Sequence, residues 1–298
     1  MSESSRPEPR LVPHEGDERL AWDTARRVLE VLEHAQDERG EATLVLTGGS
    51  MGTRVIGELA GDPDAAVIDW SRVNVWWSDE RFLPGADPER NGVQAADAWN
   101  ESLALTWDRV HPVAGADEID TVDAAAADYR DELAAAAAAE DSLTGLPHVD
   151  IALLSLGPDT HVASLFPGRQ DVLRHDEPVF AVRDSPKPPP ERVTLTRPVL
   201  NASKRVWLVL TGADKASALG LALAGHQLHQ RVVVEGEDLR RRRRDHRHRR
   251  AEVELRQHVV LVDFKPANTA CRRYHFVQWA WTKEWNGKCL DRCGQRSR

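Results

Sequence analysis

The chain has 298 residues, of which 41% are hydrophobic, so it can form one large domain or two small ones around a substantial core. Its net charge is −9, yet residues 225–298 hold 18 of the 39 Lys and Arg residues and only 9 of the 48 Asp and Glu residues. No run of about 18 apolar residues occurs, which excludes a membrane-spanning helix, and the polar start does not resemble a signal peptide. The three cysteines all lie after residue 224, so we expect a cytoplasmic protein without disulfides in its main body.

The start of the chain predicts a helix, a strand and a second helix behind a flexible arm at residues 1–16. Apolar residues at three- and four-residue steps predict a helix over residues 17–39, which Gly40 ends. Residues 43–47 predict a strand that runs into Gly48, Gly49 and Ser50, with a helix at residues 51–59. A strand, a glycine turn and a helix start form an anion-binding geometry, although such a turn also occurs without a ligand.

The next segments repeat this alternation of strand and helix. A strand is predicted at residues 73–78, followed by Asp79, Glu80, Arg81 and a loop of turn residues. An Ala-rich helix follows at residues 120–140, and then a strand at residues 149–156. Three such repeats predict an α/β fold of the doubly wound, Rossmann-like kind, with a mostly parallel sheet and helices on both faces.

The strand at residues 149–156 stops at Gly157-Pro158, and Asp159 and His161 follow directly. In an open α/β sheet, ligands bind outside the carboxyl ends of the strands, which makes this charged pair a candidate site. Further on, the sequence predicts short strands at residues 178–182 and 193–196, separated by a proline-rich extended segment. A core strand at residues 205–211 then precedes a helix that Lys215 opens.

Residues 157–167, GPDTHVASLFP, resemble the signature of 6-phosphogluconolactonases, which are related to the glucosamine-6-phosphate isomerases and deaminases. The SLFP at residues 164–167 favours the lactonase branch. Thr160 stands where the family usually has glycine, so we expect altered loop flexibility. The glycine turn, the Asp-Glu-Arg with its D-P-x-x-N segment, the Arg before V-T-L-T and the helix-opening Lys add to the resemblance, which spans about residues 44–219.

The resemblance implies hydrolysis of 6-phospho-D-glucono-1,5-lactone to 6-phospho-D-gluconate in the oxidative pentose phosphate pathway. It implies that His161 and Asp159 are catalytic, with His161 as the base for an attacking water. We expect no cofactor and no metal, and the expected partner is a small sugar-phosphate lactone. The implied substrate-binding residues are Gly48, Gly49, Ser50, Asp79, Arg81, Asn91, Arg192 and Lys215, with Lys187 a weaker candidate for the phosphate.

Two other enzymatic interpretations remain open. Residues 48–52 spell G-x-S-x-G, the pattern of a nucleophile elbow, so Ser50 could be a covalent nucleophile with His161 as its base. This ranks second, because such an elbow usually comes later in the chain. A sugar-phosphate isomerase or deaminase on the same scaffold is the other interpretation.

Residues 225–298 form an atypical basic tail in which the apolar periodicity is lost. Its Arg-rich segment, residues 238–250, resembles a nucleic-acid-binding patch. We favour a shifted reading frame in a GC-rich gene, so nucleic acid is not an expected partner. Cys289 and Cys293 with His275 do not form a convincing zinc set. If the tail is not native-like, we expect the sheet to lack an edge element.

Overall fold

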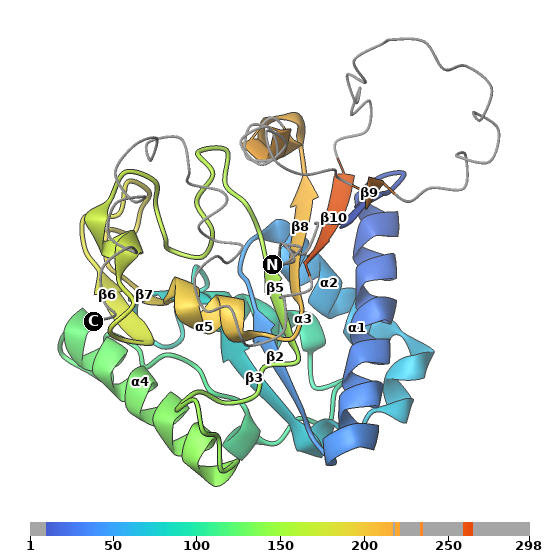
Figure 1. Ribbon diagram of the computed structural model, residues 1–298, viewed down its shortest axis with the longest axis horizontal. Helices are drawn as coiled ribbons and strands as arrows, with labels where there is room; N and C mark the ends of the chain where they lie inside the picture. Colours follow the sequence, from blue (N-terminus) through green and yellow to red (C-terminus); the bar gives the residue numbers. More distant parts are fainter. Residues whose placement is uncertain (1–9, 217, 221–232, 235–258, 265–298) are drawn as a thin grey trace, which may run out of the picture.

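The computed structural model describes residues 10–216, 218–220, 233–234 and 259–264, and its centre is a seven-stranded sheet (Figure 1). The strands follow the order β3-β2-β5-β8-β10-β1-β9. Four neighbours are parallel: β3 (Val73–Trp77), β2 (Ala42–Leu46), β5 (Ile151–Leu154) and β8 (Val206–Thr211). Beyond them, β10 (Val259–Phe264) is antiparallel to both β8 and β1 (Arg10–Pro13), and β9 (Val233–Val234) is parallel to β1. The prediction of a mostly parallel sheet is therefore confirmed.

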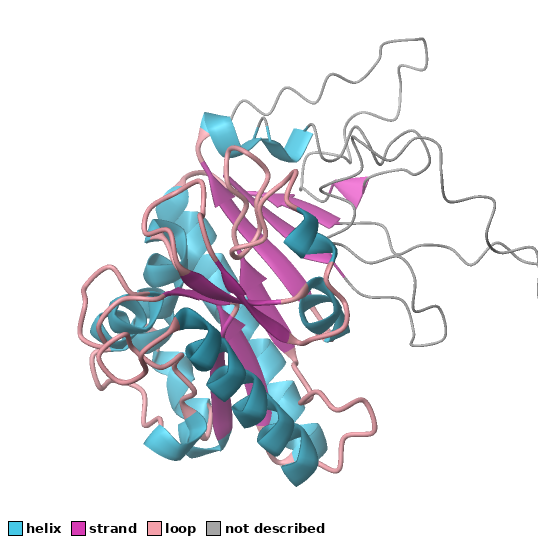
Figure 2. Cartoon of the chain, turned by 90° about the vertical axis from the view of Figure 1, so that its left-hand side faces the viewer, coloured by secondary structure: helices cyan, strands magenta, loops and turns pink. Residues whose placement is uncertain are grey.

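Helices cover both faces of this sheet, as the sequence predicted (Figures 1 and 2). One face packs against α1 (Asp17–Arg39), α2 (Ser50–Gly61) and α3 (Asn91–Trp99), and the other against α4 (Val122–Ala139) and α5 (Arg197–Ala202). Neighbouring strand residues alternate between the two cores: Leu153 packs with α1 and α2, and Leu154 with α4. Successive side chains of a strand point to opposite faces, so each fully buried strand stabilises both layers.

A second, three-stranded antiparallel sheet lies on the α4 side, in the order β4-β7-β6. It consists of β4 (Asp79–Arg81), β7 (Arg192–Leu195) and β6 (Val179–Val182). The sequence predicted strands close to β6 and β7 but placed Asp79, Glu80 and Arg81 in a loop. They form β4 instead, because β7 supplies the backbone partners, and Arg81 then lies opposite Arg192.

Three segments join the sheet although they lie outside residues 17–224, where the sequence predicts the α/β domain. Arg10–Pro13 of the expected flexible arm forms β1, Val233–Val234 of the basic tail forms β9 beside β1, and Val259–Phe264 of the tail forms β10 between β8 and β1. Among the described residues, β8 therefore has a strand on either side and does not form an edge of the sheet. Residues 1–9, most of the basic tail with its Arg-rich segment, and the three cysteines lie outside the described residues.

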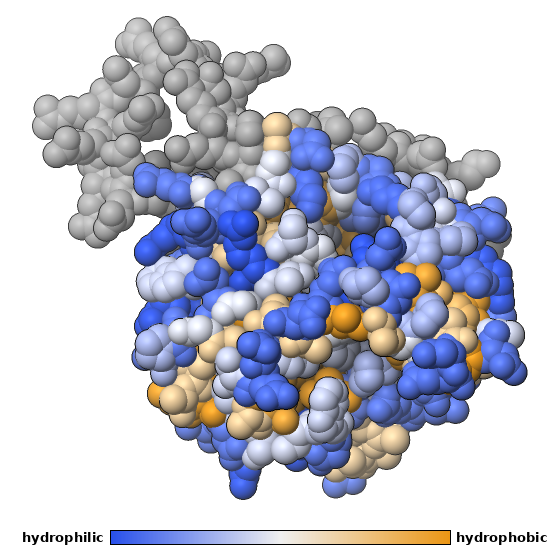
Figure 3. Space-filling view, turned by 180° about the vertical axis from the view of Figure 1, so that it is seen from behind, coloured by the Kyte–Doolittle hydropathy of each residue, from blue (hydrophilic) through white to orange (hydrophobic). Residues whose placement is uncertain are grey.

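Short 3-10 helices complete the described chain: η1 (Pro63–Val67), η2 (Trp70–Arg72), η3 (Trp107–Arg109) and η4 (Gln170–Leu173). In the described part of the chain, none of the helices has the long apolar stretch that a membrane span requires. The face in Figure 3 is largely hydrophilic with small hydrophobic areas. In the described part, the exposed large apolar side chains are Val67, Trp107, Leu143 and Leu173, which do not follow one another in sequence.

The edge strand β3 is closed by a side chain of α4. The hydroxyl of Tyr129 accepts a hydrogen bond from the backbone N–H of Trp77 at 2.8 Å and donates one to the carbonyl of Trp77 at 3.0 Å. Tyr129 is 1% exposed, so water cannot replace it at these two backbone groups. An edge strand needs such a cover for its free backbone groups, and this one fixes the strand end that leads to Asp79.

Tyr129→Phe is expected to lower the free energy of unfolding by about 1–3 kcal/mol, because it leaves two buried backbone groups of Trp77 unsatisfied. Urea unfolding at equilibrium measures the change. The matched control is Trp107→Phe, since the side chain of Trp107 is 80% exposed and its replacement should change the free energy by less than about 0.5 kcal/mol. Equal changes in the free energy of unfolding for the two variants would show that the hydrogen bonds between Tyr129 and the backbone of Trp77 do not stabilise the strand.

Candidate active site

The loop after β5 holds the candidate catalytic pair at the carboxyl end of a central strand. Gly157 brings the backbone close to the imidazole: a Cβ at this position would lie 2.1 Å from Nδ1 and Cε1 of His161. The backbone N–H of Gly157 also donates to the carbonyl of His161 at 2.8 Å. The Gly-Pro turn therefore does more than end the strand, because only glycine leaves room for the ring.

His161 and Asp159 form a direct hydrogen bond, with 2.6 Å between Nδ1 and Oδ1. An ionised carboxylate only accepts hydrogen bonds, so the neutral ring must carry its proton on Nδ1 and present the lone pair of Nε2. The ring also packs on Phe166, with centroids 4.8 Å apart. In this tautomer His161 can accept a proton from a water molecule in front of it.

The proline-rich segment brings Lys187 to the same pair. Its Nζ lies 3.1 Å from Oδ1 of Asp159 and 3.2 Å from Nδ1 of His161. We call residues 185–191 the Lys187 loop. The sequence made Lys187 a weak phosphate candidate only, whereas the structure places it in contact with both catalytic candidates.

Burial lowers the pKa of His161, the hydrogen bond and charge of Asp159 oppose this change, and the Lys187 ammonium adds to it, so the pKa lies below its ordinary value. Burial would raise the pKa of Asp159, but His161 and Lys187 outweigh burial and hold it below its usual range. An ionised Asp159 beside a neutral His161 is therefore the state at neutral pH. This state suits a base that must be free of its proton before it acts.

Asp79 is buried next to this pair. Its Oδ2 accepts a hydrogen bond of 2.6 Å from the hydroxyl of Ser164, which follows His161 in the same loop. Nη1 of Arg192 lies 3.9 Å from Oδ2 as well. The first residue of β4 is thereby joined both to the catalytic loop and to β7.

Asn91 connects Asp79 to the glycine turn after β2. Its Nδ2 donates to the carbonyl of Asp79 at 2.8 Å, and a Cβ on Gly48 would lie 1.9 Å from its Oδ1. The backbone N–H of Asn91 donates to the buried carboxylate of Glu80 at 2.8 Å. Glu80 therefore fixes the start of α3, and sequence reasoning did not single it out for any role.

Lys215 reaches the site from the segment after β8, where residues 213–216 are helical. Its Nζ donates to the hydroxyl of Ser155 at 3.1 Å, at the end of β5. Burial lowers the pKa of Lys215, Asp214 opposes this change, and the neighbouring charge of Lys187 lowers the pKa further. Two lysines that repel each other across the site form a suitable place for a phosphate.

The structure thus joins His161, Asp159, Asp79, Asn91, Gly48 and Arg192 through direct contacts or shared partners. Lys215 contacts Ser155 at the end of β5 and feels the charge of Lys187. Arg81 lies opposite Arg192 and donates to the backbone carbonyl of Glu89. Gly49 and Ser50 are exposed at the start of α2, and no hydrogen bond in the described part of the chain links Ser50 to His161. The nucleophile interpretation therefore gains no support from the geometry.

Thr160 adopts φ of 68°, in the left-handed region that favours glycine. A β-branched residue is strained there by about 1–2 kcal/mol. The sequence pointed to this residue through the glycine that the resembling family has. The strain arises because the loop must turn sharply between Asp159 and His161.

Thr160→Gly is expected to raise the free energy of unfolding by about 0.5–1 kcal/mol, because the strain relieved exceeds the added entropy of the unfolded chain. Chemical denaturation measures the change. The same substitution at Thr144, which is not among the residues with positive φ, should lower the stability instead. A lower free energy of unfolding for both variants would show that Thr160 is not strained.

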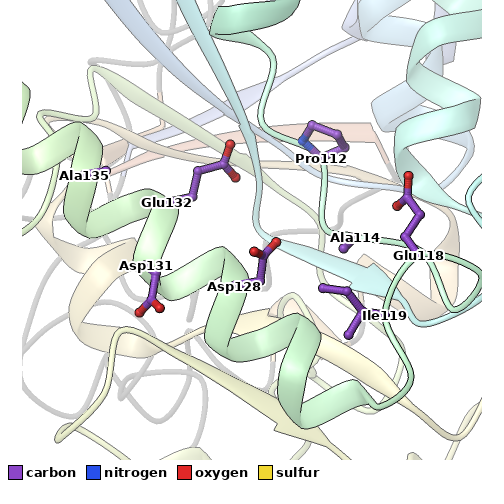
Figure 4. A pocket seen from close by; sticks show the side chains of 8 residues that line it. All are labelled: Pro112, Ala114, Glu118, Ile119, Asp128, Asp131, Glu132 and Ala135. Carbon is purple, nitrogen blue, oxygen red and sulfur yellow. The ribbon is translucent and has the colours of Figure 1, made fainter.

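A cavity of about 650 Å³ lies elsewhere, between α4 and residues 112–119 (Figure 4). Its wall carries the carboxylates of Glu118, Asp128, Asp131 and Glu132. Such a wall repels a phosphate group, so this cavity does not suit a sugar phosphate. The described residues also hold no group of three or more His, Cys, Asp or Glu side chains arranged for a metal ion.

The geometry defines a doubly wound α/β protein with an imidazole–carboxylate pair and basic side chains at the carboxyl ends of its strands. A model of the glucosamine-6-phosphate isomerases/6-phosphogluconolactonase family matches residues 15–239. The chain therefore belongs to this family. The matched range ends directly before the run of arginines that begins at Arg240.

Curated proteins that are similar to this chain include 6-phosphogluconolactonases. That of Streptomyces coelicolor is 47% identical over 219 residues, which cover 73% of this chain and 84% of that protein. That of Mycobacterium tuberculosis is 41% identical over 202 residues, or 67% of this chain and 80% of that protein. The recognition made from residues 157–167 is confirmed at the level of the family.

Solved structures of the same family share the fold. The 6-phosphogluconolactonase of Thermotoga maritima matches with a TM-score of 0.61 and 24% identity, over 72% of this chain and 89% of that chain. The enzyme of Trypanosoma cruzi matches with a TM-score of 0.63 and 23% identity, over 74% and 85% of the two chains.

Proposed function

We propose that the chain hydrolyses 6-phospho-D-glucono-1,5-lactone to 6-phospho-D-gluconate, the lactonase step of the oxidative pentose phosphate pathway, and that it does so in the cytoplasm. The observation that carries the proposal is the 2.6 Å bond between His161 and Asp159, with the ammonium group of Lys187 beside it. Membership of the family and relatives named 6-phosphogluconolactonase support the choice of substrate.

His161 is the proposed general base. Its Nε2 takes a proton from a water molecule while the water oxygen bonds to C1 of the lactone. The tetrahedral intermediate then collapses, the bond from C1 to the ring oxygen breaks, and the imidazolium returns the proton to that oxygen. Asp159 keeps the proton on Nδ1 and stabilises the imidazolium. Neither a metal nor a covalent intermediate is needed, because the lactone carbonyl is already electrophilic.

In the proposed complex, the sugar and its phosphate contact the residues around His161 and Asp159. Gly48, Gly49 and Ser50 offer small residues and free N–H groups at the start of α2, where an anion or a sugar hydroxyl is stabilised. Asp79 and Asn91 face the ring hydroxyls, and Arg81 or backbone N–H groups meet the developing oxyanion. Lys215 and Lys187 bind the phosphate, while the guanidinium of Arg192 lies behind them.

The test compares two substrates with the purified full chain. We expect faster opening of the phosphorylated lactone than in buffer, measured as acid release after subtraction of the spontaneous rate. We expect no ammonia release from glucosamine 6-phosphate, the substrate class of the other branch of the family. Ammonia release without acceleration of lactone opening would overturn the proposal in favour of a deaminase.

Lys215→Met is expected to lower kcat/KM for the phosphorylated lactone by about 10- to 150-fold, because a hydrogen bond to a charged group contributes about 1.5–3 kcal/mol. The slow hydrolysis of unphosphorylated glucono-1,5-lactone should stay unchanged, since that substrate has no phosphate to bind. Lys204→Met, at a lysine that pairs with Glu38 on the surface, is the matched control. An equal loss for both lactones would show that Lys215 does not bind the phosphate.

Ser50 distinguishes the remaining enzymatic alternative. In the proposed mechanism Ser50→Ala only weakens substrate binding, so KM rises while kcat changes little. A covalent nucleophile could not be removed in this way, because no acyl intermediate would form. Loss of kcat to the background rate in Ser50→Ala would therefore favour the serine hydrolase.

A further inference from the structure

We propose that Arg192 is a positioning residue: it holds the Lys187 loop against the pair of His161 and Asp159, and it is not a direct ligand of the substrate phosphate. The inference rests on the proposed function for the role of that pair. It differs from the role that the family resemblance implied for Arg192. The contacts of the guanidinium group carry it.

The guanidinium group of Arg192 donates hydrogen bonds to backbone carbonyls of the Lys187 loop. Nε donates to the carbonyl of Pro189 at 3.2 Å, and Nη2 donates to the carbonyls of Lys187 at 3.3 Å and Pro188 at 2.8 Å. A guanidinium group has five N–H bonds in a fixed fork, and these contacts occupy three of them. The remaining nitrogen, Nη1, lies beside the carboxylate of Asp79, and the side chain is 9% exposed.

The composition of the loop explains why it needs such a partner. Residues 188–190 are prolines, so this stretch has no backbone N–H with which to tie itself down. Its ends are fixed by the bond from the N–H of Ser185 to the carbonyl of Pro190, at 2.9 Å, and by that from Phe82 to Glu191, at 3.1 Å. Between them, one buried guanidinium group serves three successive carbonyls, and the first of these belongs to Lys187.

Holding the loop has a consequence for the catalytic pair. The charged groups that face His161 are Asp159, Lys187 and Asp79. The Lys187 ammonium lies 3.2 Å from Nδ1 and opposes a positive charge on the ring. If the loop moves away, His161 retains its proton to a higher pH, and less of the base form is present near neutrality.

The test is a double-mutant cycle on the NMR titration of His161 in the free protein. Arg192→Lys keeps the charge, but a single ammonium group cannot bind three carbonyls. It should raise the pKa of His161, in the same direction as Lys187→Met. In the Lys187→Met background it should cause no further change. Arg197→Lys, at a half-buried arginine whose lowered pKa burial alone explains, is the control and should leave the titration as in the wild type.

Inorganic phosphate separates the two roles of Arg192. A positioning residue acts through Lys187, so Arg192→Lys should weaken phosphate binding in the wild-type background but by less than about twofold in the Lys187→Met background. Equal weakening in both backgrounds, or an unchanged titration of His161 in Arg192→Lys, would overturn the proposal.

If Arg192→Lys does not fold, Arg192→Gln replaces it, with Arg81→Gln as the control for loss of a neighbouring positive charge. A rise in the pKa of His161 that is greater for Arg192→Gln than for Arg81→Gln supports the proposal, and equal rises overturn it. None of these measurements requires turnover. If the chain does not accelerate lactone opening but the double-mutant cycle gives the expected pKa changes, the proposed function is refuted. The positioning role of Arg192 is then still supported.

Discussion

Replacing His161 by alanine is expected to lower kcat/KM for 6-phospho-D-glucono-1,5-lactone by about 10²- to 10⁴-fold, the contribution of a well-placed general base. The reason is geometric, since the hydrogen bond to Asp159 leaves Nε2 as the free proton acceptor. The assay must subtract spontaneous hydrolysis, because this lactone also opens in water. His148→Ala, at an exposed histidine that binds Glu140 on the surface, is the matched control and should retain wild-type activity.

The pH profile gives a second readout of His161. A base acts only when it is unprotonated, so kcat/KM should fall as the pH drops through the pKa of His161. Burial and Lys187 hold this pKa below the ordinary value of about 6.5, so the acid limb should lie below that value. Lys187→Met should move the limb to higher pH. A wild-type limb well above 6.5, or His161→Ala with normal activity, would contradict the assignment.

Glu80→Ala is expected to lower the free energy of unfolding by about 3–5 kcal/mol, the range for removing one partner of a buried charged network. The carboxylate accepts hydrogen bonds from the backbone N–H groups of Arg81 at 2.7 Å, Asn91 at 2.8 Å and Gly92 at 2.8 Å. The buried guanidinium group of Arg90 lies 3.7 Å away. The same change should reduce activity, because Asn91 then loses its anchor beside Asp79.

Glu80→Gln separates the charge from the acceptors. The amide retains one oxygen, so the expected loss is smaller, about 1–3 kcal/mol. Burial raises the pKa of Glu80, and the three N–H groups and Arg90 oppose this change only in part. A raised pKa means that the folded state binds the proton more readily than the unfolded state, so the wild type gains stability as the pH falls through this pKa. The difference in the free energy of unfolding between the wild type and Glu80→Gln should therefore widen towards low pH.

Denaturant titrations at several pH values measure these differences. The exposed carboxylate of Glu89 is the control, and Glu89→Ala should change the free energy of unfolding by less than about 0.5 kcal/mol. A loss for Glu80→Ala no larger than that for Glu89→Ala would show that the network does not stabilise this region.

The layered core was predictable from local patterns. Helix α1 begins at Asp17 and ends at Arg39, as its apolar spacing predicted, and the strand before Gly157 was expected within a few residues of β5. Both depend on periodicity and turn residues, which act over neighbouring positions. The candidate site also followed from the sequence at His161 and Asp159, because a short motif holds both groups on one loop.

How distant segments of the chain meet could be seen only in the folded structure. Arg10–Pro13 pairs with Val259–Phe264, Asp79 begins a strand that needs β7, and Lys187 reaches His161 across 26 positions of sequence. Neither the strand pairing nor the shared donors of Arg192 leaves a local signal, because each depends on partners brought together only by packing. Local residue patterns were therefore enough to predict the α/β layers, the family and the loop that carries the candidate base His161. Only the folded chain shows that Lys187 lies beside His161 and that Arg192 donates to the carbonyls of residues 187–189. The reason is that hydrogen bonds depend on side-chain geometry and not on residue type alone.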